Sequence, residues 1–579
     1  MKHLLTVVLA AALVALIVAP AQLFAASDTL RVYASTGLLD ATVRADTLAN
    51  GNQAHHVYLL MSTDTTYIFD ATITVKSSVA FIGVPKSGTG KLPCIQPDVL
   101  GDLSIPGVLF TLTGNHSTGT FKNLYLLGIA VNNQVNYGGG QAVQLTADSA
   151  TIVADNVVFE QWSQFAIGYA GSYCKFFITN CKFRNMTTQP NQYYVGEVLR
   201  NENYVAAFKT DSIVIKNNTM LCVSGYATAA TGGIVNYYEF SHNNVIYTFK
   251  NVFFLDRMVN ARFNNNIFYG AYAGGQSKGE FSGGWDSFTA GTVASIITMG
   301  PLDSATAAIL LGHASTGAGD TSAEKLRKVE VKNNDYFWPA GLVSYWTAWN
   351  DTAHVDSIYT PVWMNAQSVN MFSTPAKWPG FVQSGNTNVD PGFGASIPGV
   401  LNPGTANANG VGLLNWFNAV RGGMGTTETY GYNFTQVQNS ATWTPPWPLP
   451  ESNDMKYSNT TLQSGATDGK QVGDLYWWVG GPTSVQQPTA VAQTYSLSQN
   501  YPNPFNPTTQ IAFTLPKGDN VSLKVFNTLG QEVTTLVSGA MAAGQHVVSF
   551  DARNLASGVY FYRLTAGSYS ATMKMMLVK

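Results

Sequence analysis

The sequence predicts an all-β protein: a right-handed parallel β-helix solenoid followed by a small antiparallel β-sandwich of immunoglobulin-like type. Two observations predict the solenoid. Short runs of β-branched and aromatic residues lack a sustained period of 3.6, and an asparagine recurs beside such runs at irregular steps. The sandwich is predicted by alternating runs, separated by turn residues, between 496 and 579. Long amphipathic helices are not expected.

Residues 1–26 are predicted to be a secretory signal peptide. Lys2 supplies a positive charge, residues 4–19 form an apolar run, and Ala25 and Ala26 offer cleavage points. The alternative is a membrane anchor. We favour the signal peptide because the run is shorter than the roughly 20 residues that a spanning helix needs.

The composition supports a large core and argues against charged partners. Of the 579 residues 45% are apolar and 11% are charged, and the net charge is −2. An apolar content of this size is not typical of a disordered chain. The near-neutral charge gives no reason to expect nucleic acid or an anionic membrane as a partner.

The four cysteines include no Cys-x-x-Cys pair, so neither a zinc site nor a redox site is predicted. Cys174 and Cys181 are the closest pair. A disulfide between them is one interpretation for an extracellular protein. Buried free thiols in an apolar core are the other.

The repeated unit is an apolar strand, an asparagine, and a further apolar or aromatic pair. Aligning the asparagines gives steps of 33, 24, 38, 26, 22 and 68 residues. The aligned residues are Asn123, Asn156, Asn180, Asn218, Asn244, Asn266 and Asn334. Such steps suit β-helix coils with loops of variable length. An asparagine at a fixed corner tolerates the left-handed backbone conformation, and its amide can hydrogen-bond to the next coil in a ladder.

Residues 27–337 are therefore predicted to be parallel β-helix coils. On the strand runs at 58–60, 73–75 and 81–83 and on the asparagine repeat, residues 50–340 resemble the pectate-lyase-like β-helix superfamily in general form. The resemblance implies the fold, and it raises polysaccharide binding or cleavage as an expectation.

Residues 338–480 are predicted to form Trp-rich final coils and a C-terminal cap over the open solenoid end. Within them, 413–421 is expected to be one short helix followed by glycines, and 473–478 a last strand. Residues 481–495 are rich in Gly, Pro, Gln, Thr and Ala and are predicted to be a linker.

Residues 496–579 are predicted to be a separate β-sandwich domain. Its entry segment is too proline-rich for a helix or a central strand. The motif residues are Tyr501, Pro502, Asn503 and Pro504 at the start, Gly530 and Glu532 at the centre, Gly558 and Tyr560 after them, and Lys574 and Lys579 at the end. On these motifs the module resembles the type A C-terminal sorting domain of the type IX secretion system. The resemblance implies export across the outer membrane, the secretion machinery as a partner, and a cell-surface or extracellular location.

Candidate catalytic residues lie on coils 209–257. Polysaccharide lyases of the resembled fold generally use a Lys or Arg base beside acidic residues, often with Ca²⁺, which wants several oxygen ligands. The candidates are Lys209, Asp211, Glu239, Asp256 and Arg257, with Lys250 nearby. Structural ion pairs or a solvated face are the alternative that we favour. No lyase signature, paired aspartates, phosphate loop or nucleophile elbow is visible.

The tryptophans after residue 338 offer candidate glycan-stacking platforms, namely Trp346, Trp349, Trp443 and Trp447. Packing of the cap is the alternative that we favour, because large rings bury large areas. We therefore expect a non-catalytic glycan-binding, adhesive or structural protein outside the cell, needing no cofactor. The open alternative is a polysaccharide lyase or glycoside hydrolase on an acidic polysaccharide, with Ca²⁺ if it is a lyase. Self-assembly of solenoids also remains open.

Overall fold

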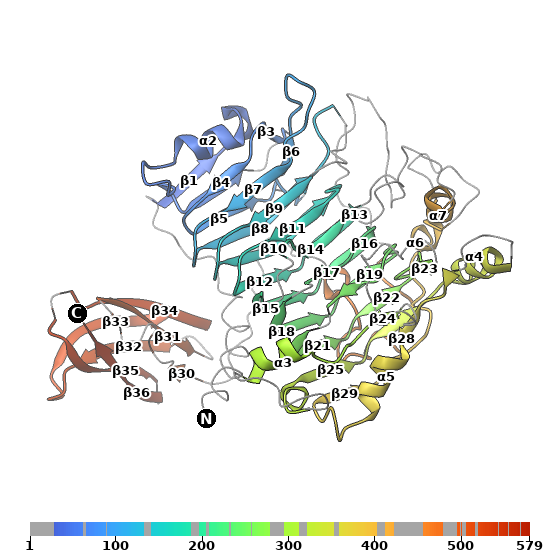
Figure 1. Ribbon diagram of the computed structural model, residues 1–579. Coiled ribbons are helices and arrows are strands. Elements are labelled where there is room, and N and C mark those ends of the chain that lie inside the picture. The colour runs from blue at the N-terminus through green and yellow to red at the C-terminus, as the bar shows by residue number, and fades with distance from the viewer. Residues whose placement is uncertain are drawn as a thin grey trace. The chain divides into compact units, whose positions relative to one another are not determined.

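The computed structural model describes the chain from Asp28 to Val578, with gaps. The undescribed residues are 1–27, 62–64, 88–89, 133–139, 187–195, 204–207, 231–232, 256, 278–294, 312–320, 352–357, 402–411, 422–454, 479–494, 498–499, 501–504, 506, 516–518, 542–543, 554, 568 and 579. The predicted signal peptide and nearly all of the predicted linker thus lie outside the described residues. The chain divides into two compact units, Met1–Gly481 and Pro482–Lys579, which are described separately (Figure 1).

The first unit is a parallel β solenoid, which confirms the predicted fold class. Its strands form three main stacks, called here the first, second and third sheets, of which the first two are joined into one continuous sheet. The first sheet stacks β1 (Thr29–Val32), β2 (Val57–Met61), β5 (Val79–Val84), β8 (Thr118–Leu127), β10 (Thr151–Glu160), β12 (Cys174–Thr179), β15 (Lys209–Lys216), β18 (Ile234–Ser241), β21 (Met258–Asn264), β25 (Lys328–Lys332) and β29 (Phe381–Ser384). All of these neighbours pair in parallel, as a chain that winds in one direction requires.

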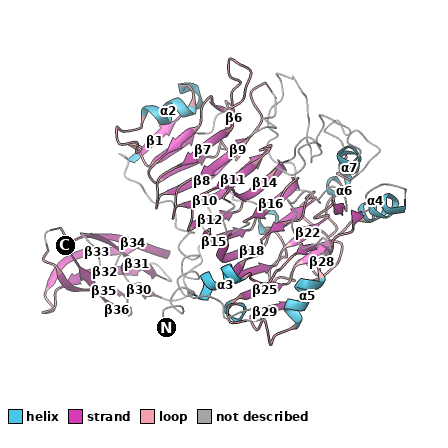
Figure 2. Ribbon diagram, in the orientation of Figure 1, coloured by secondary structure: helices cyan, strands magenta, loops and turns pink. Residues whose placement is uncertain are grey.

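Two further sheets complete each coil. The second sheet stacks β3 (Tyr67–Phe69), β6 (Cys94–Pro97), the ends of β8 and β10, β13 (Lys182–Met186), β16 (Thr219–Val223), β19 (Asn244–Ile246), β22 (Ile267–Tyr269) and β26 (Asp335–Phe337). The third sheet stacks β4 (Ile73–Val75), β7 (Val108–Leu112), β9 (Gln141–Leu145), β11 (Phe165–Tyr169), β14 (Glu197–Asn201), β17 (Thr228–Ala229) and β20 (Phe253–Phe254). Strands make up the body of the unit, and the helices lie around it (Figure 2).

A column of left-handed residues turns the chain between the first and second sheets. The column comprises Asn123, Asn156, Asn180, Asn217, His242, Asn265 and Asn333, with φ between 50° and 61°, followed by Gly385. Asparagine is favoured because its short polar side chain makes the left-handed conformation less costly. One such residue bends β8 and β10 without ending their hydrogen-bonded ladders, so each of these strands belongs to two sheets.

A second column, one residue later, points into the coil and forms the amide ladder. Its members are Asn218, Asn243, Asn266, Asn334 and Asn386, and each of the first four donates from both N and Nδ2 to Oδ1 of the next at 2.8–3.1 Å. Each Nδ2 also donates to a backbone carbonyl of the preceding coil. In the preceding coils this column continues with Leu124, Val157 and Cys181.

The predicted single asparagine ladder was therefore two columns. Asn123, Asn156 and Asn180 belong to the left-handed column, whereas Asn218, Asn266 and Asn334 belong to the amide ladder. The choice of Asn244 was wrong by one residue: Asn243 occupies the ladder, and Asn244 begins β19. Where two asparagines are adjacent in the sequence, only the backbone conformation shows which one is the left-handed corner residue and which one belongs to the amide ladder.

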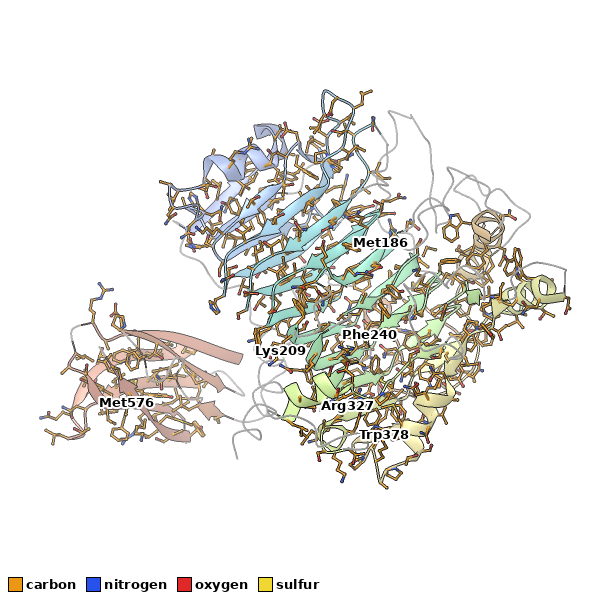
Figure 3. All side chains as sticks on the ribbon, viewed as in Figure 1. Met186, Lys209, Phe240, Arg327, Trp378 and Met576 are labelled. Atoms are coloured by element: carbon orange, nitrogen blue, oxygen red, sulfur yellow. The ribbon has the colours of Figure 1, made fainter. Side chains whose placement is uncertain are left out.

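Aromatic side chains stack on one another inside the coils. Tyr58 stacks on Phe81 with ring centroids 4.9 Å apart, and Phe81 on Phe121 at 5.9 Å. Phe240 is fully buried among the side chains inside the coils (Figure 3). All four cysteines are buried free thiols, so the Cys174–Cys181 disulfide is not formed.

Both ends of the solenoid carry a short helix that the sequence analysis did not predict. At the N-terminal end, α2 (Leu39–Ala45) lies against β3 and β4 and adds Leu39 and Val43 to the core. At the other end, α5 (Ala366–Ser373) lies beside β29, where Met371 and Trp378 are buried with Phe381. Helices α3 (Ser304–Leu311), α4 (Ala340–Asp351) and α6 (Ser396–Gly399) lie in the insertions between and after the last coils.

The Trp-rich segment 338–480 has two parts. One part supplies β29 and α5 at the end of the solenoid, as described above. The other part packs along the outer surface of the second sheet, which was not predicted. Leu221, Ile246 and Tyr269 point outward on neighbouring coils and are buried together with Trp416 and Trp477. The predicted helix over 413–421 is α7 (Leu413–Arg421). The predicted strand over 473–478 is instead a 3₁₀ turn, Leu475–Trp477, because the Asp474 side chain caps the Tyr476 N–H at 2.9 Å.

The second unit is the predicted antiparallel β-sandwich. One sheet contains β30 (Ser496–Leu497), β31 (Thr508–Leu515) and β34 (Gly544–Asp551). The other is ordered β33 (Glu532–Met541), β32 (Asp519–Phe526), β35 (Gly558–Ala566) and β36 (Tyr569–Leu577). Alternate residues such as Leu523, Leu564 and Met575 fill the space between the sheets.

We expect Asn266→Ala to lower the free energy of unfolding by about 2–4 kcal/mol, because it leaves buried donors and acceptors of Asn243 and Asn334 unpaired. Denaturant titration of the protein measures the change. Asn266→Asp should be similarly harmful, since a carboxylate cannot donate. Asn370→Ala, at an exposed helical asparagine, is the control and should change stability by less than about 0.5 kcal/mol. Equal effects at the two sites would contradict the ladder's role.

Candidate functional site

The predicted catalytic residues do not converge on one site among the residues that the structure describes. Asp211 is the extra residue of a bulge on β15 and pairs with Lys175 at 3.4 Å. Glu239, on β18, accepts from Tyr237 and Ser241 at 2.8 Å each and lies 3.8 Å from Lys216. Each acid thus already has its own donor or cation.

The remaining candidates are also engaged or outside the described chain. Arg257 forms an ion pair with Asp303 at 2.6 Å. Lys209, labelled in Figure 3, lies 5.8 Å from the Tyr173 ring centroid, and the buried Lys250 lies 5.3 Å from that of Tyr226. Asp256 lies outside the described residues. Across the described ranges, no group of three His, Cys, Asp or Glu side chains is placed to hold a metal ion.

The two described candidate tryptophans pack rather than project. The Trp346 indole is buried and donates to the Ala273 carbonyl at 2.9 Å. Trp349 packs on the cluster that covers the second sheet, with its ring centroid 6.1 Å from Tyr345. Trp443 and Trp447 lie outside the described residues.

A polar cluster that the sequence reading missed lies on the third sheet and is called here the Glu202 cluster. It consists of Gln141, Gln144, Gln164, Arg200 and Glu202. The three consecutive strands β9, β11 and β14 place these residues together, since Gln144 pairs with Gly168 and Gly168 with Arg200. Glu202 immediately follows β14, and its N–H donates to the Tyr169 carbonyl at 2.7 Å.

Amides surround the Glu202 carboxyl. Gln141 Nε2 and Gln144 Nε2 each lie 3.5 Å from one of its oxygens, and Gln141 Nε2 also donates to Gln164 Oε1 at 3.2 Å. Burial raises the pKa of Glu202, while the hydrogen bonds from the two glutamines and the charge of Arg200 oppose this rise. The carboxyl therefore takes up a proton at a higher pH than an exposed glutamate does.

Gly168 makes room for this carboxyl. A Cβ at this position would lie 2.4 Å from Glu202 Oε1 and 3.0 Å from Gln141 Oε1. Gln141 Oε1 is buried and has no hydrogen-bond partner among the residues that the structure describes.

An ion pair and an aromatic ring border the cluster. Arg200 Nη1 donates to both oxygens of Glu197 at 2.9 and 3.1 Å, and both side chains are buried. The Arg200 guanidinium lies 5.9 Å from the ring centroid of the partly exposed Phe165. A carboxyl, amides, a guanidinium and a ring on one face provide the groups that commonly contact sugar hydroxyls and ring faces.

A second polar network fixes the segment 465–478, called here the strap, along the left-handed corner column. Asn333 Nδ2 donates to the Gly465 carbonyl at 2.6 Å, and Leu475 N–H donates to Asn217 Oδ1 at 2.6 Å. Asp474 accepts from Thr219 Oγ1 at 2.6 Å, and the Lys182 ammonium lies 3.2 Å from the Tyr476 ring centroid. The strap therefore crosses successive coils.

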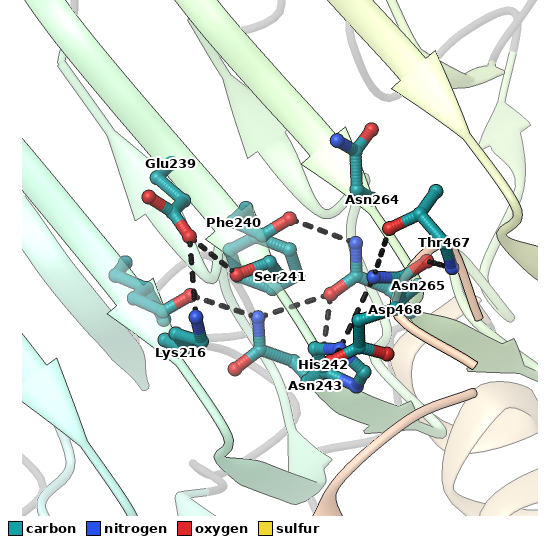
Figure 4. A network of polar contacts seen from close by, with 12 residues as sticks. Lys216, Glu239, Phe240, Ser241, His242, Asn243, Asn264, Asn265, Thr467 and Asp468 are labelled. Carbon is teal, nitrogen blue, oxygen red and sulfur yellow. Dashed lines mark hydrogen bonds and ion pairs between the residues drawn. The ribbon is translucent and has the colours of Figure 1, made fainter. Parts of the chain in front are cut away.

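His242 lies at the centre of this network (Figure 4). Thr467 N–H donates to Asn265 Oδ1 at 2.8 Å, which fixes the Asn265 amide so that its Nδ2 faces His242 Nε2 at 3.1 Å. Nε2 must then accept, and Nδ1–H donates to the Gly473 carbonyl at 3.2 Å. The geometry therefore requires neutral His242.

Charged neighbours act on His242 from both sides. Burial lowers the pKa of His242, Asp468 at 3.4 Å opposes this, and Lys216 and Lys470 add to the lowering. A histidine whose pKa is lowered in the folded state binds a proton more readily when the strap is detached. The contribution of His242 to strap attachment is thus fully present above its unperturbed pKa of about 6.5 and is lost as the pH falls below it. Burial raises the pKa of Asp474, in the same strap, to about 7, and protonation of this carboxyl acts in the opposite direction.

Comparison with known protein families identifies the second unit as a sorting domain. Residues 499–579 match the family described as Secretion system C-terminal sorting domain. No curated protein matches the chain, and no solved structure does. The described residues include no helix long and apolar enough to cross a membrane.

This match establishes where the protein goes. A sorting domain of the type IX secretion system directs export across the outer membrane, so the protein reaches the cell surface or the extracellular space through that machinery. Of the motif residues, Gly530 lies in the β32–β33 turn with φ 77°, and Glu532, Gly558, Tyr560 and Lys574 lie on strands β33, β35 and β36. Tyr501, Pro502, Asn503, Pro504 and Lys579 lie outside the described residues.

We expect His242→Asn to remove the contribution of His242 to the acid sensitivity of the strap, because asparagine suits the left-handed corner and does not titrate. Hydrogen exchange at the Gly473 and Leu475 amides, corrected for intrinsic rates, measures strap attachment between about pH 7 and pH 5. Relative to the variant, in which Asp474 still titrates, exchange in the wild type should become faster as the pH falls. The same change with pH in both proteins would contradict a role for His242.

Proposed function

We propose that this protein is a non-catalytic, glycan-binding β-helix that works outside the cell in an adhesive or structural role. The Glu202 cluster is the observation that carries the proposal. Its carboxyl and amides can donate to and accept from sugar hydroxyls, and Phe165 offers a ring beside them. Gln144, Phe165 and Glu202 are each partly exposed, so a sugar can reach them.

The neighbouring faces support binding over catalysis. On the first sheet, Lys122–Asp155, Lys175–Asp211 and Lys332–Glu330 are ion pairs at 3.0, 3.4 and 2.6 Å. Each of these acids is thus already bound by a lysine, and none of the three is left as a free acid or base for catalysis.

One observation favours the alternative, a glycoside hydrolase. Burial raises the pKa of Glu202, and Arg200 binds the carboxylate of Glu197 on the preceding strand β14 through both oxygens. Glycoside hydrolysis uses two carboxyl groups in different environments, one as acid and one as carboxylate. Substitution of Glu202 separates the two functions.

The first experiment incubates the exported protein with acidic and neutral polysaccharides in the presence of Ca²⁺. Retention without new reducing ends or unsaturated uronate is the expected result. Gln144→Ala combined with Glu202→Ala should weaken retention about tenfold or more, since several hydrogen bonds are lost. Gly168→Ala should act similarly by displacing Glu202.

The control is Lys122→Ala combined with Asp155→Ala, an ion pair on the first sheet, which should leave retention unchanged. Glu202→Gln distinguishes the alternative: it keeps hydrogen bonding, so binding should change little, whereas a hydrolase would lose about 10²-fold or more of its rate. Formation of product by the wild type would overturn the non-catalytic proposal. If neither retention nor product appears, glycan binding is excluded.

A further inference from the structure

The outer face of the four-stranded sheet in the sorting domain carries an apolar band. The band consists of Phe526, Val559, Phe561, Met576 and Val578. Their neighbours along the strands, such as Val525, Tyr562 and Leu577, point the other way and are buried between the sheets. Met576 and Val578 remain 41% and 48% exposed, and Phe526, Val559 and Phe561 are partly exposed.

The register makes this band continuous. Phe526 on β32 pairs with Phe561 on β35, and Phe561 pairs with Lys574 on β36. Val559 pairs with Met576 one step further along. Directly paired side chains on one face of a sheet are in contact. Met576, at the surface of the second unit, is labelled in Figure 3.

Cations border the band. Arg563 and Lys574 are exposed on the same face, and the Arg563 guanidinium lies 5.2 Å from the Phe526 ring centroid. Lys524 lies beside Arg563 and pairs with Glu532 at 2.8 Å. The imbalance extends to the whole domain: residues 496–579 contain six lysines and arginines against three acidic residues, whereas residues 27–495 contain 24 against 30.

This face is unlike the usual outer face of an antiparallel sheet, which is polar. Apolar residues bordered by charges mark an interaction surface, and aromatic, Met and Arg side chains are enriched where proteins bind one another. The motif residues Gly558 and Lys574 lie on β35 and β36, and Glu532 on the neighbouring β33 pairs with Phe526. Lys574 is exposed and takes no part in the core.

We propose that this face is the docking surface of the sorting domain, and that it binds a component of the export machinery through an apolar depression bordered by carboxylates. The sorting domain has a net positive charge, which complements an acidic receptor, whereas the remainder of the chain has a net negative charge. An acidic receptor would attract the domain and would not attract the rest of the protein. The core supplies the rigid support, since Tyr562 and Leu564 are fully buried directly beneath the band.

The test is export of the full-length chain in a bacterium that possesses a type IX system. Arg563→Glu and Arg553→Glu form a matched pair: both arginines are exposed, both changes alter the charge equally, and only Arg563 lies on the docking face. We expect Arg563→Glu to lower the cell-surface fraction about tenfold, with precursor retained in the periplasm. Arg553→Glu should leave this fraction unchanged.

Phe561→Ser combined with Met576→Ser examines the apolar band in the same assay and should also block export. Limited proteolysis of each retained precursor establishes that the sorting domain is folded. Normal export of a folded Arg563→Glu variant would overturn the proposal, as would equal loss with Arg553→Glu. If the serine variant does not fold, the outcome rests on the arginine pair, whose side chains lie in solvent.

Discussion

The left-handed corner is the constraint on which the solenoid depends. One residue with positive φ must turn the chain in every coil, and its place must repeat so that the strands on both sides stay in register. Asparagine meets this backbone requirement. In the later coils the next residue is asparagine as well, and its amide satisfies buried backbone groups on the adjacent coil. The corner and the ladder together allow coils that differ in length to stack regularly.

The corner also determines which surfaces remain for function. The strap follows the corner column, and the Trp-rich segment covers the outer side of the second sheet, which therefore becomes a second core. The first sheet presents a face of mutually paired charges. The third sheet carries the partly exposed Glu202 cluster, on which the proposed glycan binding rests.

Local sequence rules predicted much of the architecture because its elements are local. The strands, the helix at 413–421 and the sandwich follow from alternation, turn residues and glycine positions. The error at Asn244 arose because neighbouring asparagines look alike until the backbone conformation is known. The strap and the Glu202 cluster were not predictable in this way. Gln141 and Glu202, or His242 and Asp468, meet only through the stacking of coils, and no spacing in the chain signals that Gly168 makes room for a carboxyl.

The strap has a consequence for how the protein folds. A solenoid with only neighbouring contacts can form from any point and can lose coils one at a time. Here Asn217 and Thr219 bond to residues 258 and 255 positions later in the chain. Such distant closures slow folding and join separate repeats into one cooperative unit. The middle coils therefore reach their final stability only after almost the entire chain before the sorting domain has been made, which links completion of the fold to arrival of the export signal.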